Sequence, residues 1–320
     1  GQALSEAIPA FGGKGSHYGS IATIGAAVPT PKAFVVPVYY YWQFMQQNGF
    51  DAYVQQMLVD QSFINSPAVR DQRLAELRAD MLAAPVDASF TAQLLAKLQA
   101  EYPGLRMRFR SSTNAEDLDG FTGAGLYTSL SGDPGDPTAS VLDAVRGVWS
   151  SVWYFRAFEE RSYRSIGHDT VGMALLVHRS FPDEEANGVA LTANPYDSSG
   201  LEPGFYINVQ AGGSSVVKPE VGVTTDQFVY HYSMPGQPIV FISNSNLVPA
   251  GQSVLTTTQT YKLGQALDAI QTHFYKTYGP TTASSSAWYA MDVEFKFDGL
   301  PGEEPALYVK QARPHPGRGQ

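Results

Sequence analysis

Residues 110–130 read RSSTNAEDLDGFTGAGLYTSL, and this stretch decides how the rest of the chain is interpreted. The preceding residues, Leu105 to Phe109, have apolar side chains at alternate positions and predict a strand that ends at Arg110. Three glycines allow positive φ and a close approach of backbone N–H groups to an anion, namely Gly120, Gly123 and Gly125. Hydroxyl donors come from Ser111, Ser112, Thr113, Thr128 and Ser129. The stretch predicts a phosphate-binding loop in which Arg110 supplies a bidentate charge, and a polar surface loop is the alternative.

The composition limits the classes of protein to consider. With 320 residues, of which 43% are hydrophobic and 16% charged, the chain is typical of a globular protein of about two domains. No apolar run reaches the ~18 residues that a membrane-spanning helix requires, so we expect no membrane partner. The net charge of −9 argues against nucleic acid as a partner. The sequence has no cysteine, which excludes disulfides, thiolate catalysis and cysteine metal sites but does not fix the compartment. We expect a cytoplasmic protein.

The N-terminal region contains a second glycine turn, Gly12-Gly13-Lys14-Gly15. Ser16 can cap a helix predicted over residues 17–24. A lysine on a glycine turn at the start of a helix combines positive charge with free N–H groups, which is an arrangement that suits phosphate. A surface lysine in a turn is the alternative interpretation.

The middle of the chain predicts a scaffold. Helical periodicity extends from residue 39 to 102, with helices at 50–60, 68–82 and 88–101. Thr138 can cap one long helix that reaches about Tyr163. Its buried stripe would consist of Val141, Val145, Val148, Val152 and Phe155, thickened by Trp149 and Trp153. The arginines of this helix are expected to face water, namely Arg156, Arg161 and Arg164.

Strands follow. Residues 171–178 form an almost continuous apolar run, which is typical of a strand buried on both faces, and further strands are predicted at 188–192 and 205–210. In the run 290–298, alternation places Asp292 and Glu294 on one face. In the run 307–313, Gln311 and Arg313 share a face, so a hairpin would bring them beside the two carboxylates. Two carboxylates beside an amide and a guanidinium suit Mg-nucleotide chemistry, because the carboxylates offer oxygen ligands to the metal and the guanidinium offers positive charge to a phosphoryl group. The alternative is an edge hairpin with ordinary cross-strand ion pairs.

Several of these motifs resemble one known family. Arg-Ser-Ser, Ala-Glu-Asp-Leu and Phe-x-Gly-x-Gly-Leu-Tyr-x-Ser resemble the nucleotide-binding domain of the phosphoenolpyruvate synthase, pyruvate phosphate dikinase and glucan, water dikinase family. The other resembling motifs are Gly-Gly-Lys with Val28-Pro-Thr-Pro31, the strand at 171–178 with the hairpin at 187–195, and Asp-x-Glu followed by Gln-Ala-Arg-Pro. These four motifs stand in the family's order from Gly12 to Pro314.

The resemblance implies an α+β, two-lobed ATP-grasp-like fold with the nucleotide between the lobes. The N-terminal lobe would be residues 1–170 and the C-terminal lobe 171–320. The implied catalytic residues are Lys14, Arg110 and Arg313. The implied nucleotide-binding residues are Lys14, Arg110, Gly123, Gly125, Ser129, Gln311, Arg313 and the main chain at His178, which would face the adenine. The implied Mg²⁺ ligands are Asp292 and Glu294.

The resemblance implies an ATP-dependent phosphotransferase that passes a phosphoryl group from Mg-ATP to a histidine. The histidine would lie on a swivelling domain, in the same longer protein or in a separate chain. His17 in Gly-Gly-x-x-Ser-His resembles the family's phosphohistidine segment, but the sequence that follows it matches the nucleotide domain. The family often has Gly-Leu-Gly-Glu where this chain has residues 211–215, AGGSS, so a carboxylate role is not implied there. The alternatives are a ligase-like activation of a carboxylate and a non-catalytic nucleotide-binding module.

Overall fold

The computed structural model describes residues 2–115, 125–136, 140–197, 201–280, 288–299, 302–315 and 317. The chain divides into two compact units. The first unit comprises residues 2–16 and 32–180, and the second comprises residues 17–31 and 181–320. The boundary expected near residue 170 falls inside the first unit, because strand β4 (Met173–Arg179) pairs with two other strands of that unit. The elements of each unit are helices and antiparallel strands, as the predicted α+β class requires.

The first helix starts earlier than the sequence predicted. Helix α1 (Gln2–Ala22) is kinked at Gly12, where φ is 70° and ψ is 171°. Helical residues therefore lie on both sides of Gly12, and Ser16 lies inside the helix instead of capping it. Glycine adopts positive φ without the Cβ clash that other residues meet, so the kink falls at the first residue of the glycine turn.

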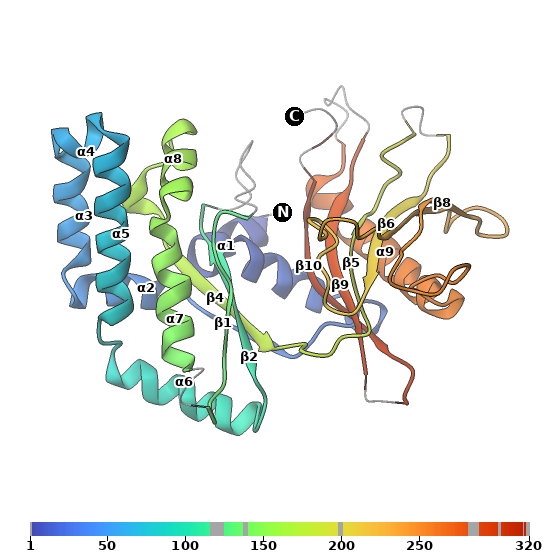
Figure 1. Ribbon diagram of the computed structural model, residues 1–320, viewed down its shortest axis with the longest axis horizontal. Coiled ribbons are helices and arrows are strands. Elements are labelled where there is room, and N and C mark those ends of the chain that lie inside the picture. The colour runs from blue at the N-terminus through green and yellow to red at the C-terminus, as the bar shows by residue number, and fades with distance from the viewer. Residues whose placement is uncertain are drawn as a thin grey trace. The chain divides into compact units, whose positions relative to one another are not determined.

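The helices of the first unit form the predicted scaffold. Several of them lie side by side in Figure 1, with α5 in contact with α3, α4, α7 and α8. The helices at 50–60, 68–82 and 88–101 are confirmed. The elements of this scaffold are α2 (Val38–Gln47), α3 (Phe50–Val59), α4 (Gln61–Asn65), α5 (Pro67–Ala83), α6 (Ala88–Glu101), α7 (Val141–Ser150), η3 (Ser151–Trp153), α8 (Phe155–Tyr163) and η4 (His168–Thr170). Side chains of Asp60, Ser66, Asp87 and Ser140 cap four of them.

The single long helix expected up to Tyr163 is wrong. Helix α7 begins at Val141 and is capped by Ser140, whereas Thr138 lies outside the described residues. The 3-10 turn η3 and the extended residue Tyr154, with ψ of 137°, separate α7 from α8. Because of this break, α8 does not continue the helical turn of α7, and a different set of its residues faces the core. The buried residues of α8 are Ala157, Phe158 and Arg161.

The predicted core stripe is confirmed for its valines and tryptophans, whereas Phe155 is only partly buried. Val145, Val148 and Trp149 are completely buried, and the Trp149 ring centroid lies 5.1 Å from that of Phe44. Arg156 and Arg164 are exposed as expected. Arg161 was expected to face water but has an exposed fraction of 0%, because the new phase of α8 turns it inward with Ala157.

A four-stranded antiparallel sheet completes the first unit, in the order β1-β4-β2-β3. The strands besides β4 are β1 (Ala33–Val36), β2 (Met107–Thr113) and β3 (Leu130–Gly132). Strand β2 continues past Arg110 to Thr113, because β4 pairs with the whole of it. Arg110 therefore lies within a strand rather than at its end.

The second unit is built on a six-stranded antiparallel sheet, in the order β10-β9-β5-β6-β7-β8. Its elements are η1 (Gly25–Ala27), β5 (Ala186–Leu191), β6 (Phe205–Ala211), β7 (Asp226–Tyr230), β8 (Ile239–Ser243), α9 (Thr257–Tyr278), β9 (Met291–Asp298) and β10 (Ala306–Pro314). The strands predicted at 188–192 and 205–210 are confirmed as β5 and β6. Strands β7 and β8 and helix α9 were not predicted from the sequence.

Helix α9 packs on β9 and β10 of this sheet. Thr256 and Gln259 form a capping box at its start, and Leu263, Leu267 and Ile270 are completely buried. Among the described residues, no helix is both long and apolar enough to cross a membrane.

Candidate functional site

Strand β2 presents an apolar face and a cationic face. Met107 and Phe109 are completely buried in the core, whereas Arg108 and Arg110 point to the opposite face. Arg110 is only 8% exposed. Burial lowers the pKa of Arg108, and the neighbouring charges of Arg110 and Arg106 lower it further. Arg108 was not among the predicted site residues, although a period of two places it on the same face of the strand as Arg110.

The glycine turn is held against β2 by one serine. The Ser112 hydroxyl donates to the Phe11 carbonyl at 2.8 Å and accepts from the Gly15 N–H at 2.9 Å. A Cβ atom at Gly12 would lie 2.1 Å from the Ser112 carbonyl oxygen, and Gly12 has a φ of 70°. Only glycine fits this contact. Since Ser112 follows Arg110 by two residues, the turn packs against the strand face that carries Arg110.

Lys14 stands at the start of the second half of α1, where it is partly buried. The first N–H groups of a helix carry partial positive charge and favour an anion. The structure thus brings together the turn that carries Lys14 and the strand that carries Arg108 and Arg110. This arrangement of cationic groups and N–H groups suits phosphate oxygens.

The glycine-rich stretch is described only in part. Gly123 lies outside the described residues, and Gly125 has a φ of 70° with no atom within 4 Å of an added Cβ. Ser129 accepts a hydrogen bond from the Ser111 N–H at 3.4 Å through its hydroxyl oxygen. The end of the stretch is therefore attached to β2, beside Arg110.

His178 lies in the interior of the first sheet. It is opposite Ala33 of β1 on one side and Arg108 of β2 on the other. Its side chain is 2% exposed, and its Nδ1 donates to the Arg179 carbonyl at 2.7 Å. Strands pair with the main chain of β4 on both sides here, so an adenine contact through the main chain of His178 would replace sheet hydrogen bonds.

The hairpin of β9 and β10 brings the four predicted residues of the second unit together. Asp292 is opposite Arg313, and Glu294 is opposite Gln311. The register shifts between Val309 and Gln311, which leaves one extra residue in β10. Strict alternation from Val309 would place Gln311 on the core face. The bulge therefore places Gln311 and Arg313 on the face of the carboxylates.

Charges alternate in sign on this face of the hairpin. Arg313 donates to Asp292 Oδ2 from Nε at 3.0 Å and from Nη2 at 2.8 Å. Glu294 Oε2 lies 3.8 Å from Lys310 Nζ. In the described part of the chain, no group of three or more His, Cys, Asp or Glu side chains could enclose a metal ion. Two carboxylates fit Mg²⁺, which usually takes one or two carboxylates and completes its shell with water and phosphate oxygens.

The turn at residues 211–215 is held by hydrogen bonds from one side chain to its main chain. The Asn187 amide donates to the Gly212 carbonyl at 2.6 Å and to the Ser214 carbonyl at 2.8 Å. The nearest carboxylate to Gly213 belongs to Glu184, with Oε1 3.5 Å from an added Cβ. Glu184 forms an ion pair with Lys296, so this carboxylate is already engaged.

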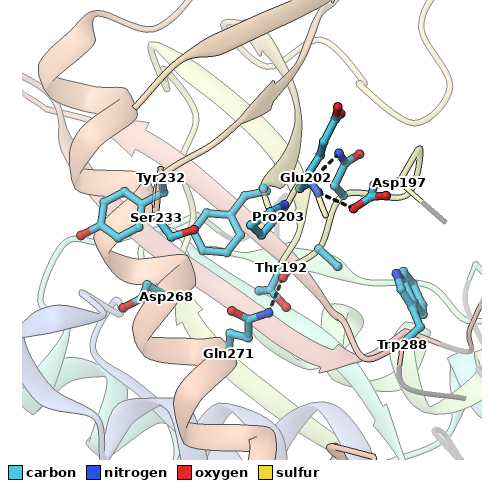
Figure 2. Close-up of a pocket in the computed structure, with 13 residues that line it drawn as sticks. Thr192, Asp197, Glu202, Pro203, Tyr232, Ser233, Asp268, Gln271 and Trp288 are labelled. Carbon is cyan, nitrogen blue, oxygen red and sulfur yellow. Dashed lines mark hydrogen bonds between the residues drawn. The ribbon is translucent and has the colours of Figure 1, made fainter. Parts of the chain in front are cut away.

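A separate cavity of about 170 Å³ lies in the second unit (Figure 2). Gln271 donates to the Thr192 carbonyl at 2.7 Å on its wall. The described lining includes the carboxylates of Asp197, Glu202 and Asp268 but no lysine, arginine or histidine. Phosphate would be repelled there, so this cavity does not suit the phosphates of a nucleotide.

Comparisons with known proteins agree with this geometry. The chain matches the family described as "Pyruvate phosphate dikinase, AMP/ATP-binding domain" over residues 8–320. It is 26% identical over 233 residues to phosphoenolpyruvate synthase of Aeropyrum pernix, a match that covers 69% of this chain and 27% of the relative. It is 25% identical over 363 residues to a probable phosphoenolpyruvate synthase of Pyrococcus abyssi, covering 97% of this chain and 42% of the relative. A match to phosphoenolpyruvate synthase of Neisseria meningitidis is 24% identical over 344 residues and covers 97% and 40%.

The chain therefore spans less than half of the length of these relatives. The family match extends over nearly the whole chain, and the α+β architecture agrees with the ATP-grasp-like fold of the family. The chain belongs to the pyruvate phosphate dikinase AMP/ATP-binding domain family.

Proposed function

We propose that this chain binds Mg-ATP and passes a phosphoryl group from it to a histidine of another domain. The observation that carries the proposal is the packing of the Gly12–Gly15 turn on β2 by Ser112. That packing orders Lys14 and Arg110 within one unit, and ordered cations stabilise the charge of a transferring phosphoryl group.

In the first unit, Lys14 and Arg110 bind phosphate oxygens. Arg110 is fixed by the strand and presents a planar fork, whereas Lys14 provides a flexible point charge. Arg108, on the same face, adds positive potential. Gly123, Gly125 and Ser129 contribute backbone and hydroxyl donors to the same phosphates.

In the second unit, Asp292 and Glu294 would hold Mg²⁺. The ion would supply positive charge to the phosphate oxygens. Asp292 also holds the Arg313 fork in place through two hydrogen bonds to Oδ2. Arg313 then binds phosphate in a fixed orientation, and the Gln311 amide binds the nucleotide.

The acceptor is a histidine on a domain outside this chain, either elsewhere in a longer protein or in a separate protein. The lengths of the relatives support a domain outside this chain. The match covers only 42% of the Pyrococcus abyssi protein, so most of that protein lies outside it. On transfer, a bond forms between an imidazole nitrogen and the phosphorus. The bond from that phosphorus to the bridging oxygen breaks, and the remaining nucleotide leaves with that oxygen.

The first test is a thermal shift. Mg-ATP at millimolar concentration should raise the melting temperature, because a ligand that binds only the folded state stabilises it by mass action. Adenosine should have a smaller effect, since it lacks the phosphates that the cationic residues bind. No response to Mg-ATP would exclude the proposed function. Binding without turnover would agree with it, because the acceptor is outside the chain.

The second test identifies the product. The chain is incubated with ATP labelled at the terminal phosphate and the part of the Pyrococcus abyssi relative outside the match. Label in an acid-labile, alkali-stable protein phosphate supports transfer to histidine. Label in a hydroxylamine-sensitive small molecule would support carboxylate activation instead.

A further inference from the structure

Arg161 is a buried charge that no carboxylate of the described residues neutralises. It is 0% exposed, and none of the ion pairs in the described residues includes it. Removing a guanidinium from water costs several kcal/mol, so such a residue persists only where its other contacts compensate. Its contacts therefore indicate what it does.

The guanidinium contacts three neutral groups. Its Nη1 donates to the Tyr127 hydroxyl at 3.4 Å, and its Nε donates to His168 Nδ1 at 3.3 Å. Its carbon Cζ lies 5.8 Å from the ring centroid of Trp153. The Nη2 group has no hydrogen-bond partner among the described residues. Arg161 thus points its donors to the end of the glycine-rich stretch on one side and to His168 on the other.

His168 is fixed in one tautomer by these contacts. Because the Arg161 Nε can only donate, Nδ1 of His168 is an acceptor and the proton is on Nε2, which donates to the Ser162 hydroxyl at 3.0 Å. The ring stacks on Phe158, with centroids 3.7 Å apart and an interplanar angle of 8°. The acceptor that holds Arg161 is itself held by helix α8.

The other end of the network is the segment after Gly125. Leu126 is 7% exposed and packs against Ala157 of α8, one turn before Arg161. Tyr127, which accepts from Arg161, follows directly. Two residues further on, Ser129 is bonded to Ser111 of β2. The segment 126–129 is therefore attached to α8 by an apolar and a polar contact and to β2 by a third.

We propose that Arg161 is a positioning residue that fixes Tyr127, and with it the segment 125–131, against helix α8. Its role as an anchor stands on the contacts of the first unit alone. Its effect on ligand binding rests on the proposed function, because the segment would then present donors to the phosphates of ATP. An arginine that only filled the core would stabilise the whole unit without favouring one segment.

The test compares three variants. Arg161→Met removes the charge and keeps much of the volume, and Tyr127→Phe removes only the hydroxyl. Arg78→Met is the matched control, because Arg78 donates to the Trp153 carbonyl at 2.8 Å and lies over the Tyr154 ring, away from Tyr127. Amide hydrogen exchange is measured without ligand at residues 126–131 and in helix α7. Affinities for Mg-ATP and adenosine are measured for each variant.

The proposal expects faster exchange at residues 126–131, by at least about tenfold relative to α7, in Arg161→Met and in Tyr127→Phe. The ratio of ATP affinity to adenosine affinity should fall by at least about tenfold in both, and Arg78→Met should change neither quantity. Uniform acceleration throughout the unit, or unchanged exchange at 126–131 in Tyr127→Phe, would overturn the proposal. If the wild type bound no ATP, the proposed function would fail, and the exchange data alone would still decide whether Arg161 is the anchor.

Discussion

Lys14 and Arg110 belong to different elements of the first unit, and Ser112 joins the turn that carries Lys14 to the strand that carries Arg110. We expect Lys14→Ala and Arg110→Ala each to weaken ATP binding by roughly 1.5–3 kcal/mol, the usual contribution of a charge-assisted hydrogen bond. Adenosine binding should change much less, because it lacks the phosphates. Calorimetric titration of both ligands checks this.

Lys97→Ala is the control for these two variants, since Lys97 forms an i,i+4 ion pair with Glu101 on the surface of α6. It should leave both affinities unchanged. Equal losses of ATP and adenosine in Lys14→Ala and Arg110→Ala would show that these residues support the fold rather than bind phosphate.

A substitution of Glu294 in the second unit is expected to affect phosphoryl transfer and ATP binding to different extents. Glu294→Gln keeps the size of the side chain and removes one negative charge, which the proposed function places beside the nucleotide phosphates. We expect phosphoryl transfer to fall by at least ~10²-fold, or about 2.7 kcal/mol of barrier, while ATP binding falls much less. Single-turnover transfer from labelled ATP at increasing Mg²⁺ measures the effect. The control is Glu304→Gln, which disrupts only a surface ion pair with Lys262; near-wild-type transfer by folded Glu294→Gln would place the metal elsewhere.

Single residues were predictable where their role depends on local alternation. Asp292 and Glu294 share a face because β9 is a regular strand whose alternate residues Val293 and Phe295 are buried on the other face. The bulge before Gln311 was not predictable, because an extra residue in a strand leaves no clear mark in a run of alternating side chains. The burial of Arg161 was also missed, since it depends on a break in the preceding helix.

His168, in η4 just after α8, is expected to make the stability of the first unit depend on pH in the acid range. Burial is the main cause that lowers the pKa of His168 from 6.5 to about 3, and the charge of Arg161 is the second cause. Below pH 6.5 the unfolded chain binds a proton here and the folded chain does not, so the free energy of unfolding falls as the pH drops toward about 3. Above that range this group contributes no pH dependence.

His168→Gln checks this expectation, because its amide can accept from Arg161 and donate to Ser162 without titrating. Urea unfolding of both proteins between about pH 7.5 and 4.5 gives the difference in their free energies of unfolding. Wild type should lose stability relative to the variant as the pH falls. A difference that stays constant with pH would show that His168 is protonated equally in the folded and unfolded states.

Among the helices and strands, those with a clear periodicity of apolar residues were predicted from the sequence. Strands β4, β5 and β6 and helices α3, α5 and α6 were predicted close to their observed bounds. The end of β2 was not, because Ser111–Thr113 has the composition of a loop and becomes a strand only through pairing with β4. Helix α9 was missed although its capping box at Thr256 and its apolar residues at helical spacing were available in the sequence.

The charge of the whole molecule contrasts with that of the candidate site. The chain has a net charge of −9, yet Arg108 and Arg110 lie on β2 and Arg106 stands directly before it, and burial together with the charges of Arg110 and Arg106 lowers the pKa of Arg108. Under the proposed function, a nucleotide polyanion would be attracted by this local arrangement of cations and not by the net charge. Composition alone could exclude nucleic acid as the expected partner, but it could not reveal this local field.

The contact between Gly12 and Ser112 also limits how the chain can evolve. Every single-nucleotide missense change in a glycine codon introduces a Cβ atom, and at Gly12 that atom would meet a main-chain oxygen at 2.1 Å. The obstacle is backbone, so no rotamer of a neighbouring side chain relieves it. Gly49 also has positive φ, but no atom lies within 4 Å of its added Cβ, so asparagine or aspartate can replace it. We therefore expect glycine to be kept at position 12 of this chain, and sequence change near it to occur at the neighbouring positions.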